Sequence, residues 1–277
     1  MSYLSIKKRF LLSHAHSHSL QGLKYVPHSS NPSEYMVLGV GIVTDINAAI
    51  KDGNIVIAET YTDESGNTYN VTRINEKAFF ENNTVKRVEI PESITEIAWA
   101  AFEGCENLKT LNFHDNCSAV LSLGCFYRCK ALEMVTIPAS ITEVGDSVFR
   151  ECQSLKKVVL NGAVGTRMFL SCQNLKEVYI GDDITTLSER AFAYCSKLDT
   201  VRMGKNVEHI AIQVFYETSL KEIDFSQHTL VPTLENAYAF KGIERIIVPE
   251  ILYEEWIVAD EWSRLASRII KASEVAQ

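Results

Sequence analysis

The stretch from residue 141 to residue 160 reads Ile141-Thr-Glu-Val144-Gly-Asp-Ser-Val148-Phe149-Arg-Glu-Cys152-Gln-Ser-Leu155-Lys-Lys-Val158-Val-Leu160. It places four apolar features at fixed spacing: an aliphatic pair, a phenylalanine, a cysteine followed by a leucine, and an alternating aliphatic pair. The same order of features returns along most of the chain. This stretch is therefore one unit of an internal repeat.

The phenylalanine marks each unit. Successive phenylalanines are separated by 23, 24, 23, 20, 23, 23 and 25 residues. They are Phe79, Phe102, Phe126, Phe149, Phe169, Phe192, Phe215 and Phe240. In five units a cysteine follows three residues later, at Cys105, Cys129, Cys152, Cys172 and Cys195. A period of ~20–29 residues with a Leu-x-x-Val-x-Ile segment is typical of leucine-rich solenoids.

The alternating segment has one apolar and one polar face, as in a half-buried strand. A single unit is too small to bury its apolar face, so we expect the units to stack around one continuous core. The predicted fold is a mostly β, right-handed leucine-rich repeat solenoid of about eight ~23-residue units, with a concave parallel sheet and capped ends. The unit from Asn161 to Phe169 lacks three residues, which predicts a tightened loop with the strand register kept.

Two units, Cys129–Phe149 and Cys172–Phe192, resemble the repeat of the BspA-type leucine-rich repeat proteins, Cys-x-x-Leu-x-x-Ile-x-Ile-Pro-x-x-Ile-x-x-Ile-x-x-x-Ala-Phe. Pro138 stands at the proline position of the first unit, and Gly181 takes that place in the second. The resemblance extends over roughly residues 20–270. It implies a bacterial surface or secreted protein of adhesion or host interaction.

Segments outside the repeat are expected to cover its open edges, because a bare edge strand recruits other chains. Apolar positions Leu252, Trp256, Leu265 and Ile269 predict two short amphipathic helices near the C-terminus. Near the N-terminus, strands are predicted at 35–43, 55–61 and 68–71, the last two joined by the turn 63–67. The expected regions are an arm at 1–22, a strand-rich cap at 23–73, repeats at 74–249 and a helical cap at 250–277.

Composition limits the partners. The 277 residues are 46% apolar and 22% charged, with a formal net charge of −8 and Lys and Arg scattered along the chain. We therefore expect no nucleic-acid partner and no membrane insertion. The basic cluster at residues 7–9 is followed by too short an apolar run for a secretory signal. The surface or secreted location implied by the resemblance and a cytoplasmic one both stay open.

No catalytic motif is present, so neither an enzyme nor a cofactor is expected. His14, His16 and His18 alternate and favour a polar linker over a metal site. The column of five cysteines predicts buried structural thiols, because Cys packs as a small hydrophobe. Cys117 and Cys125 lie off this column, and whether they pair is left open.

Outward strand positions form the candidate binding surface, because stacked units create an extended recognition face. One column holds Glu89, Asn112, Thr136, Val159, Tyr179, Arg202, Asp224 and Ile247. The other holds Arg87, Thr110, Met134, Lys157, Glu177, Thr200, Glu222 and Arg245. The predicted site is the middle of both columns: Met134, Thr136, Lys157, Val159, Glu177, Tyr179, Thr200 and Arg202.

Tyr and Arg are common interface anchors, although Val and Tyr also suit any strand. Acidic Glu222 and Asp224 at one end suggest a basic patch on a partner. The favoured function is a non-enzymatic module that binds a protein or a glycan. The alternative is a structural subunit of a phage or bacterial surface assembly that acts through self-association, and the oligomeric state is not predicted.

Overall fold

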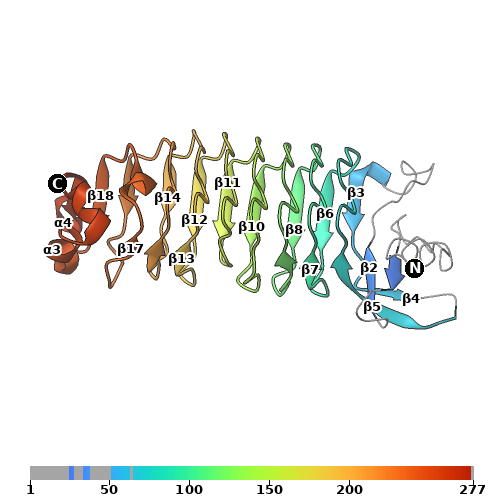
Figure 1. Cartoon of the computed structure of the whole chain (residues 1–277). Coiled ribbons are helices and arrows are strands. Elements are labelled where there is room, and N and C mark those ends of the chain that lie inside the picture. Colours follow the sequence, from blue (N-terminus) through green and yellow to red (C-terminus); the bar gives the residue numbers. More distant parts are fainter. Residues whose placement is uncertain (1–24, 28–33, 38–50, 63–64, 276–277) are drawn as a thin grey trace, which may run out of the picture.

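The computed structural model describes residues 25–27, 34–37, 51–62 and 65–275. The coils lie side by side in one elongated row, with the C-terminal helices at one end and a β-hairpin at the other (Figure 1). The predicted leucine-rich repeat solenoid of short parallel strands is confirmed. Within the described part of the chain, no helix has both the length and the apolar character needed to cross a bilayer.

Each coil contributes one strand to a parallel row. Its strands pair in three groups, β3-β6-β8, β10-β11-β12-β14 and β16-β18-β19. Their bounds are β3 (Asn54–Val56), β6 (Arg87–Ile90), β8 (Thr110–Phe113), β10 (Met134–Ile137), β11 (Lys157–Leu160), β12 (Glu177–Ile180), β14 (Thr200–Arg202), β16 (Glu222–Asp224), β18 (Arg245–Val248) and β19 (Ile269–Lys271). We call the outward side of these ten strands the strand face.

A second row of parallel strands contains the second residue of the aliphatic pair that precedes most of the phenylalanines. These strands are β5 (Thr68–Ile74), β7 (Glu96–Ile97), β9 (Val120–Leu121), β13 (Thr186–Leu187), β15 (His209–Ile210) and β17 (Thr233–Leu234). Most have two residues, too few for period-two alternation to identify them from sequence. The sequence located the apolar positions of this row but not its strands.

The shortened unit tightens on the side of this second row. The row is interrupted between β9 and β13, where only an isolated bridge joins Leu121 to Val144. Strands β10, β11 and β12 nevertheless stay in register, with Val135 beside Val158 and Val158 beside Val178. A Cβ on Gly162 would lie 2.3 Å from the Ile141 carbonyl oxygen. The predicted tightened loop with an unchanged strand register is confirmed.

The eight phenylalanines stack inside the solenoid, and all are at most 1% exposed. From Phe79 to Phe215, successive ring centroids lie 4.7 to 5.5 Å apart with interplanar angles of 4° to 6°. Each columnar cysteine donates its thiol hydrogen to the phenylalanine carbonyl of the preceding coil, as Cys172 does to Phe149 at 3.2 Å. All seven cysteines are buried and free, Cys117 and Cys125 included.

The backbone around the first seven phenylalanines, Phe79 to Phe215, is left-handed at the residues two before and two after each ring. At Phe149 these are Ser147 and Glu151, both with φ 59°. The N–H groups of Ser147, Phe149 and Glu151 donate to carbonyl oxygens of the next coil at 2.8 to 3.0 Å. This ladder between coils offsets the strain of L-residues in the left-handed region. The left-handed residues could not be predicted from sequence, because glycine is the usual indicator of this conformation and most of these positions are not glycine.

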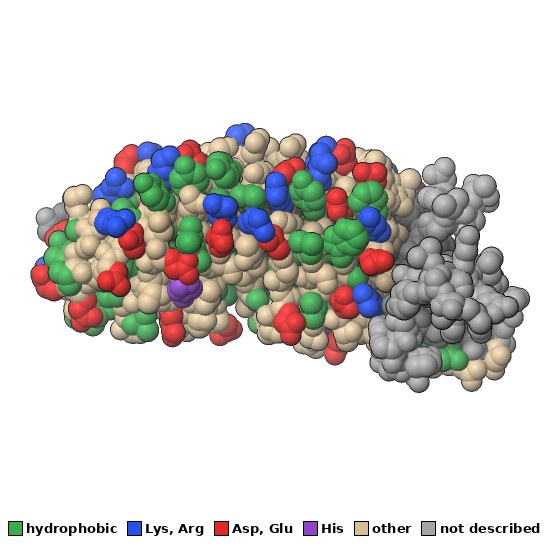
Figure 2. All heavy atoms as spheres, in the orientation of Figure 1, with side chains coloured by type: hydrophobic (Ala, Val, Ile, Leu, Met, Phe, Trp, Pro, Cys, Tyr) green, Lys and Arg blue, Asp and Glu red, His purple; other side chains and the backbone are tan. Residues whose placement is uncertain are grey.

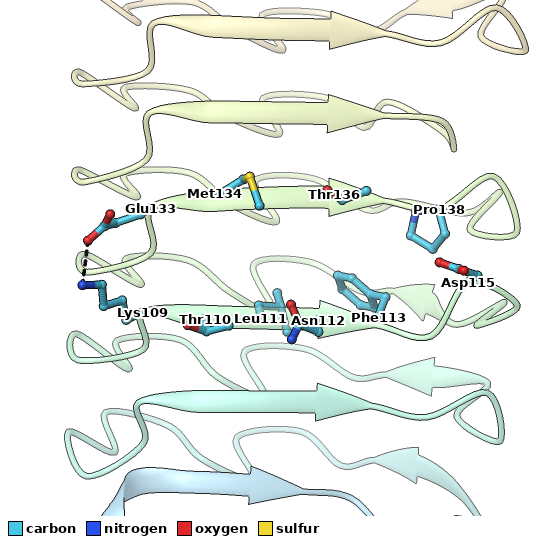
Figure 3. Close-up of a pocket in the computed structure, with 10 residues that line it drawn as sticks. All are labelled: Lys109, Thr110, Leu111, Asn112, Phe113, Asp115, Glu133, Met134, Thr136 and Pro138. Carbon is cyan, nitrogen blue, oxygen red and sulfur yellow. Dashed lines mark ion pairs between the residues drawn. The ribbon is translucent and has the colours of Figure 1, made fainter.

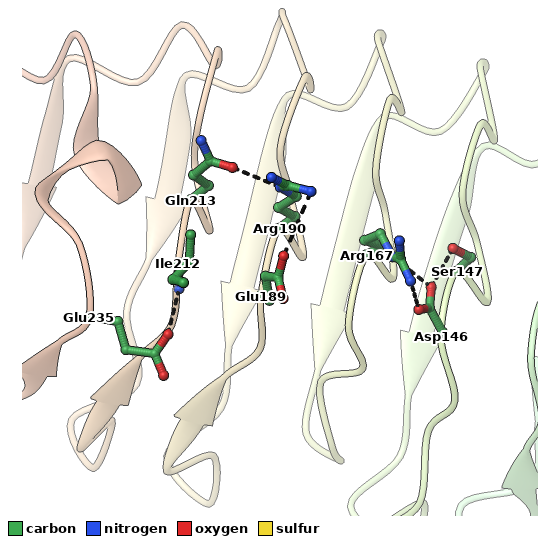
Figure 4. A network of polar contacts seen from close by, with 8 residues as sticks. All are labelled: Asp146, Ser147, Arg167, Glu189, Arg190, Ile212, Gln213 and Glu235. Atoms are coloured by element: carbon green, nitrogen blue, oxygen red, sulfur yellow. Dashed lines mark hydrogen bonds and ion pairs between the residues drawn. The ribbon is translucent and has the colours of Figure 1, made fainter.

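Side chains from these turns also link neighbouring coils (Figure 4). Arg167 donates through Nε to Asp146 Oδ1 at 3.0 Å and through Nη2 to Oδ2, and Ser147 Oγ donates to Oδ1 at 2.5 Å. Burial raises the pKa of Asp146, but the hydrogen bonds from Arg167 and Ser147 outweigh it and leave that pKa below its usual range. Arg190 Nε donates to Gln213 Oε1 at 2.7 Å. The contacts of Arg167 and Arg190 join one coil to the next, and that of Ser147 stays within its own turn.

The N-terminal end differs from the expectation in one respect. Strands β4 (Thr60–Thr62) and β5 form the predicted antiparallel hairpin. The single strand predicted at 55–61 is wrong, because β3 pairs with β6 on the strand face while β4 turns back onto β5. Strand β2 (Glu34–Val37) pairs with β1 (Tyr25–Pro27) and with β5. Residues 38–43 of the predicted first strand lie outside the described residues.

The predicted helical segment contains η3 (Glu250–Leu252), α3 (Tyr253–Trp256) and η4 (Asp260–Arg268). Two further short helices, η2 (Ala237–Phe240) and α4 (Ala272–Val275), lie outside the two helices predicted from sequence. Placing Ile269 on a helix was wrong, since it lies in β19 beside Ile246. Trp256 and Trp262 are buried, with ring centroids 4.5 Å apart, and both pack against Phe225. This aromatic cluster closes the core where the repeats end.

Candidate functional site

The eight predicted site residues form two adjacent columns on the strand face. In one column, Met134 lies beside Lys157, Lys157 beside Glu177 and Glu177 beside Thr200. The other column runs Thr136, Val159, Tyr179, Arg202 in the same register. All eight side chains are half-buried or exposed. The structure thus brings the eight together, and their binding role stays a prediction.

The longer outward column ends differently from the expectation. Ile247 was predicted to face solvent, but it is 5% exposed. It pairs with Ile270 of β19, a strand that the repeat pattern did not indicate. In the column that contains Ile247, the solvent-exposed part of the strand face therefore ends before β18.

Tyr179 is the centre of a compact cluster on the strand face. The Lys157 Nζ lies 4.3 Å from the Tyr179 ring centroid, and the Arg202 Cζ lies 5.0 Å from it. Strands β11 and β14 flank β12 on opposite sides, so the two cations approach the ring from opposite neighbours. Such cation–π contacts hold the three side chains in a defined arrangement. The Tyr179 hydroxyl donates to Glu177 Oε2 at 3.3 Å.

Several charges on the strand face, within the Tyr179 cluster and beyond it, are matched within the protein. Lys157 pairs with Glu177 at 3.7 Å, and Arg245 pairs with Glu222. Asp224 Oδ1 accepts the backbone N–H of Ser226 at 2.7 Å. The acidic end formed by Glu222 and Asp224 is thus partly neutralised internally. Figure 2 shows apolar side chains interspersed with basic and acidic ones along the row of coils.

A hollow of about 400 Å³ opens between β8 and β10 (Figure 3). Its walls combine apolar side chains with polar ends, and its lining residues are Lys109, Thr110, Leu111, Asn112, Phe113, Asp115, Glu133, Met134, Thr136 and Pro138. Met134 is 54% exposed. Four of these residues, Thr110, Asn112, Met134 and Thr136, stand in the outward columns predicted from sequence, whereas the hollow itself was not predicted.

The hollow coincides with an interruption of the paired strands. Strand β8 pairs with β6, and β10 pairs with β11, but β8 and β10 belong to separate groups. Phe113 occupies the inward position that Ile90 holds on the preceding strand. Its larger ring packs edge-on against Phe126, with centroids 6.2 Å apart, and it stays half-buried. Phe113 in place of the aliphatic residue is the sequence feature that distinguishes this strand end, and the repeat pattern alone did not identify it.

The buried cysteine thiols are structural. Burial raises the pKa of the Cys105 and Cys172 thiols to about 12, so both carry their hydrogen at neutral pH. Among residues 51–62 and 65–275, no three His, Cys, Asp or Glu side chains gather as a metal site would require. His14, His16 and His18 lie outside the described residues.

Comparison with known proteins identifies the repeat. The family model described as BspA type Leucine rich repeat region matches residues 64–166 and 120–247, in six copies. Comparison with curated protein sequences finds no match.

Solved structures give the same architecture. A crystal structure of a T. pallidum leucine-rich repeat protein is 22% identical with a TM-score of 0.59, covering 73% of this chain and 88% of that one. A leucine-rich repeat protein from Bacteroides ovatus is 19% identical with a TM-score of 0.52, covering 82% of this chain and 70% of that one. A leucine rich cell surface protein from Faecalibacterium prausnitzii is 15% identical with a TM-score of 0.32, covering 92% of this chain and 93% of that one. The first two likenesses show the fold alone.

Proposed function

The chain belongs to the BspA-type leucine-rich repeat family, and from this premise we propose that it is a non-enzymatic binding module that recognises a protein partner through the strand face. The observation that carries the proposal is Tyr179 held between Lys157 and Arg202. Interface energy concentrates in Tyr, Trp and Arg side chains near the centre of a contact surface. A tyrosine already fixed by its neighbours loses little conformational entropy when a partner binds.

A protein partner is favoured over a glycan by the surroundings of this tyrosine. Lys157 and Arg202 approach the ring from the two neighbouring strands, so its faces are already occupied. A sugar that stacks on an aromatic ring needs an open face. The mixture of apolar side chains with paired charges also matches the make-up of protein interfaces.

We propose the bacterial surface, in adhesion or host interaction, as the place where this binding occurs. The support is the family resemblance. Labelling of intact cells with an antibody against the repeats tests the location separately: labelling without lysis supports it, and labelling only after lysis contradicts it.

The binding role is tested by a double variant, Tyr179→Ala with Val159→Asp. The matched control is Tyr238→Ala, because Tyr238 is 58% exposed and lies outside the strand face. Wild type, double variant and control are immobilised, and the proteins that each retains from a host-cell extract are compared. We expect wild type and control to retain the same protein, and the double variant to lose it while keeping its thermal unfolding midpoint.

Two results would contradict the proposal. Equal retention by all three proteins would place binding elsewhere. Retention that disappears after periodate oxidation of the extract would identify a glycan as the recognised group. Light scattering on the same samples checks for self-association, and a stable oligomer unaffected by the double variant would support the structural-subunit alternative instead.

A further inference from the structure

We propose that the hollow between β8 and β10 binds one lysine or arginine side chain of the protein partner. The aliphatic stem of that side chain lies over Phe113 and Pro138, its cationic end meets the Asp115 carboxylate, and its backbone lies on the side of Met134. This inference rests on the proposed function, because it treats the strand face as the binding surface. It adds the chemistry of one recognised group, at a hollow bordered by β10, which is two strands from Tyr179 and next to the strand of Lys157.

The lining of the hollow suits a side chain that is apolar along its stem and charged at its end. Phe113, Met134 and Pro138 supply apolar surface. At one end of the hollow, Lys109 Nζ is paired with Glu133 Oε1 at 3.1 Å. At the other end, Asp115 lies beside Pro138 (Figure 3). Lys and Arg bury their methylene stems on apolar surface while the charged end stays polar, which matches this layout.

Asp115 occupies a turn position at which other coils match a carboxylate with a basic side chain. The position is two residues beyond the last inward residue of the face strand. Asp182 takes this position after β12, and Lys205 of the next coil pairs with it at 3.3 Å. Glu92 takes it after β6, and His114 of the next coil lies 3.6 Å away.

At Asp115 the next coil supplies no such group. Pro138, Ala139 and Ser140 stand where the next coil would carry a base, with Ala139 at the position that corresponds to Lys205. Ser140 Oγ donates to the backbone carbonyl oxygens of Asp115 at 2.9 Å and of Cys117 at 2.6 Å, and not to the Asp115 carboxylate. Across the described ranges, no ion pair or hydrogen bond involves the Asp115 carboxylate. Among the described residues, the Asp115 carboxylate is therefore open to a basic group of a partner.

A charged end, and not merely an apolar group, is what this arrangement recognises. A hydrogen bond between an ammonium or guanidinium and a carboxylate contributes about 1.5–3 kcal/mol, which corresponds to roughly tenfold or more in affinity. A purely apolar side chain would leave Asp115 as it is in the free protein. The binding free energy of an apolar side chain would then come only from the apolar area that it buries on Phe113 and Met134.

The test uses three blocked tripeptides, acetyl-Gly-X-Gly-amide, with X as lysine, Nε-acetyl-lysine or norleucine. Each is titrated into protein labelled with carbon-13 at the methionine methyl groups, and the Met134 methyl resonance is assigned by its loss in Met134→Leu. We expect the lysine peptide to shift this resonance saturably. The other two peptides should bind about tenfold more weakly or less.

Three variants sharpen the test. Asp115→Asn should weaken the lysine peptide about tenfold, whereas Asp183→Asn, which removes the same charge at an exposed turn on another coil, should leave its affinity within about twofold. Ala139→Lys should fill the vacant position from within, as Lys205 does for Asp182, and should block the lysine peptide. Ala139→Gln should not block it.

Equal binding of the lysine and norleucine peptides, an unmoved Met134 resonance in all three titrations, or unchanged binding in Ala139→Lys would each overturn the inference. An unchanged thermal unfolding midpoint confirms that each variant is folded. None of these outcomes bears on the Tyr179 test. A partner lost by the Tyr179 double variant but retained by Asp115→Asn would leave the proposed function standing and remove only the claim about the hollow.

Discussion

The rings of Phe126 and Phe149 lie parallel within 5°, with their centroids 5.2 Å apart. The two residues are 23 positions apart in sequence, one full coil of the solenoid. The centroid separation is close to the ~4.8 Å spacing of neighbouring strands, so the ring stack and the strand row advance together. Ring stacking therefore fixes the same register that the strand hydrogen bonds fix on the other side of the core.

Removal of one ring from this stack should destabilise the fold strongly. Phe149→Ala deletes a side chain that is 0% exposed and contacts a ring on either side. We expect a loss of about 3–5 kcal/mol in the free energy of unfolding, measured by guanidinium titration. Lys156→Ala, an exposed substitution on the same coil, should change it by at most about 0.5 kcal/mol. Similar midpoints for both variants would contradict the stacked core.

The shortened coil should tolerate no added methyl group at Gly162. Its Cβ would approach the Ile141 and Pro138 carbonyl oxygens at 2.3 and 2.4 Å. Gly162→Ala should therefore lower the free energy of unfolding by roughly 1–3 kcal/mol, as overpacking does elsewhere. Asn161→Ala, at the exposed neighbour, should stay within about 0.5 kcal/mol of wild type. The thermal unfolding midpoints of the two variants are compared. Equal midpoints would contradict the close approach of Gly162 to the backbone at Pro138 and Ile141.

Acidification should weaken the C-terminal end of the solenoid through His228. This side chain is 4% exposed, neither ring nitrogen has a hydrogen-bond partner, and the ring packs edge-on against Phe225. Burial lowers the pKa of His228, and the nearby Phe225 backbone and the charges of Asp224 and Asp182 offset this effect only in part. The unfolded chain therefore binds this proton more readily, and stability falls as the pH drops below about 6.5 toward the lower folded-state pKa.

The variant His228→Phe isolates that contribution. Between pH 6.5 and pH 5, the free energy of unfolding of the variant should fall less steeply than that of wild type, because the titrating group is gone. Tryptophan fluorescence reports the transition, since Trp256 and Trp262 also pack against Phe225. Equal slopes for the two proteins would show that His228 does not titrate differently on unfolding.

The seven thiols should be unreactive in the folded protein. All are buried and free, and burial raises the pKa of Cys105 and Cys172 to about 12. With an aromatic disulfide reagent at pH 8, we expect no thiol to react within minutes in buffer and seven to react in guanidinium chloride. Five reactive thiols in denaturant without reductant would instead indicate a disulfide, such as one between Cys117 and Cys125.

The two outward columns could be predicted from sequence because strand alternation has a period of two and the repeat has a nearly constant length. Once Val158 and Leu160 are assigned inward, Lys157 and Val159 must point outward. Parallel stacking then places Val159 beside Tyr179, as observed. The hollow could not be predicted this way, because it arises where β8 and β10 part and not from either strand alone.

The sequence by itself determined the coil, its buried columns and the order of the outward side chains, since each of these depends on spacing within a unit and on identical units lying in register. Tertiary structure alone decided three features: the left-handed turns at residues such as Ser147, the pairing of Ile269 with Ile246, and the unmatched carboxylate of Asp115. The physical reason is that each of these depends on what the neighbouring coil offers at a contact. Such contacts join residues more than twenty positions apart, and the pattern within a single unit carries no record of them.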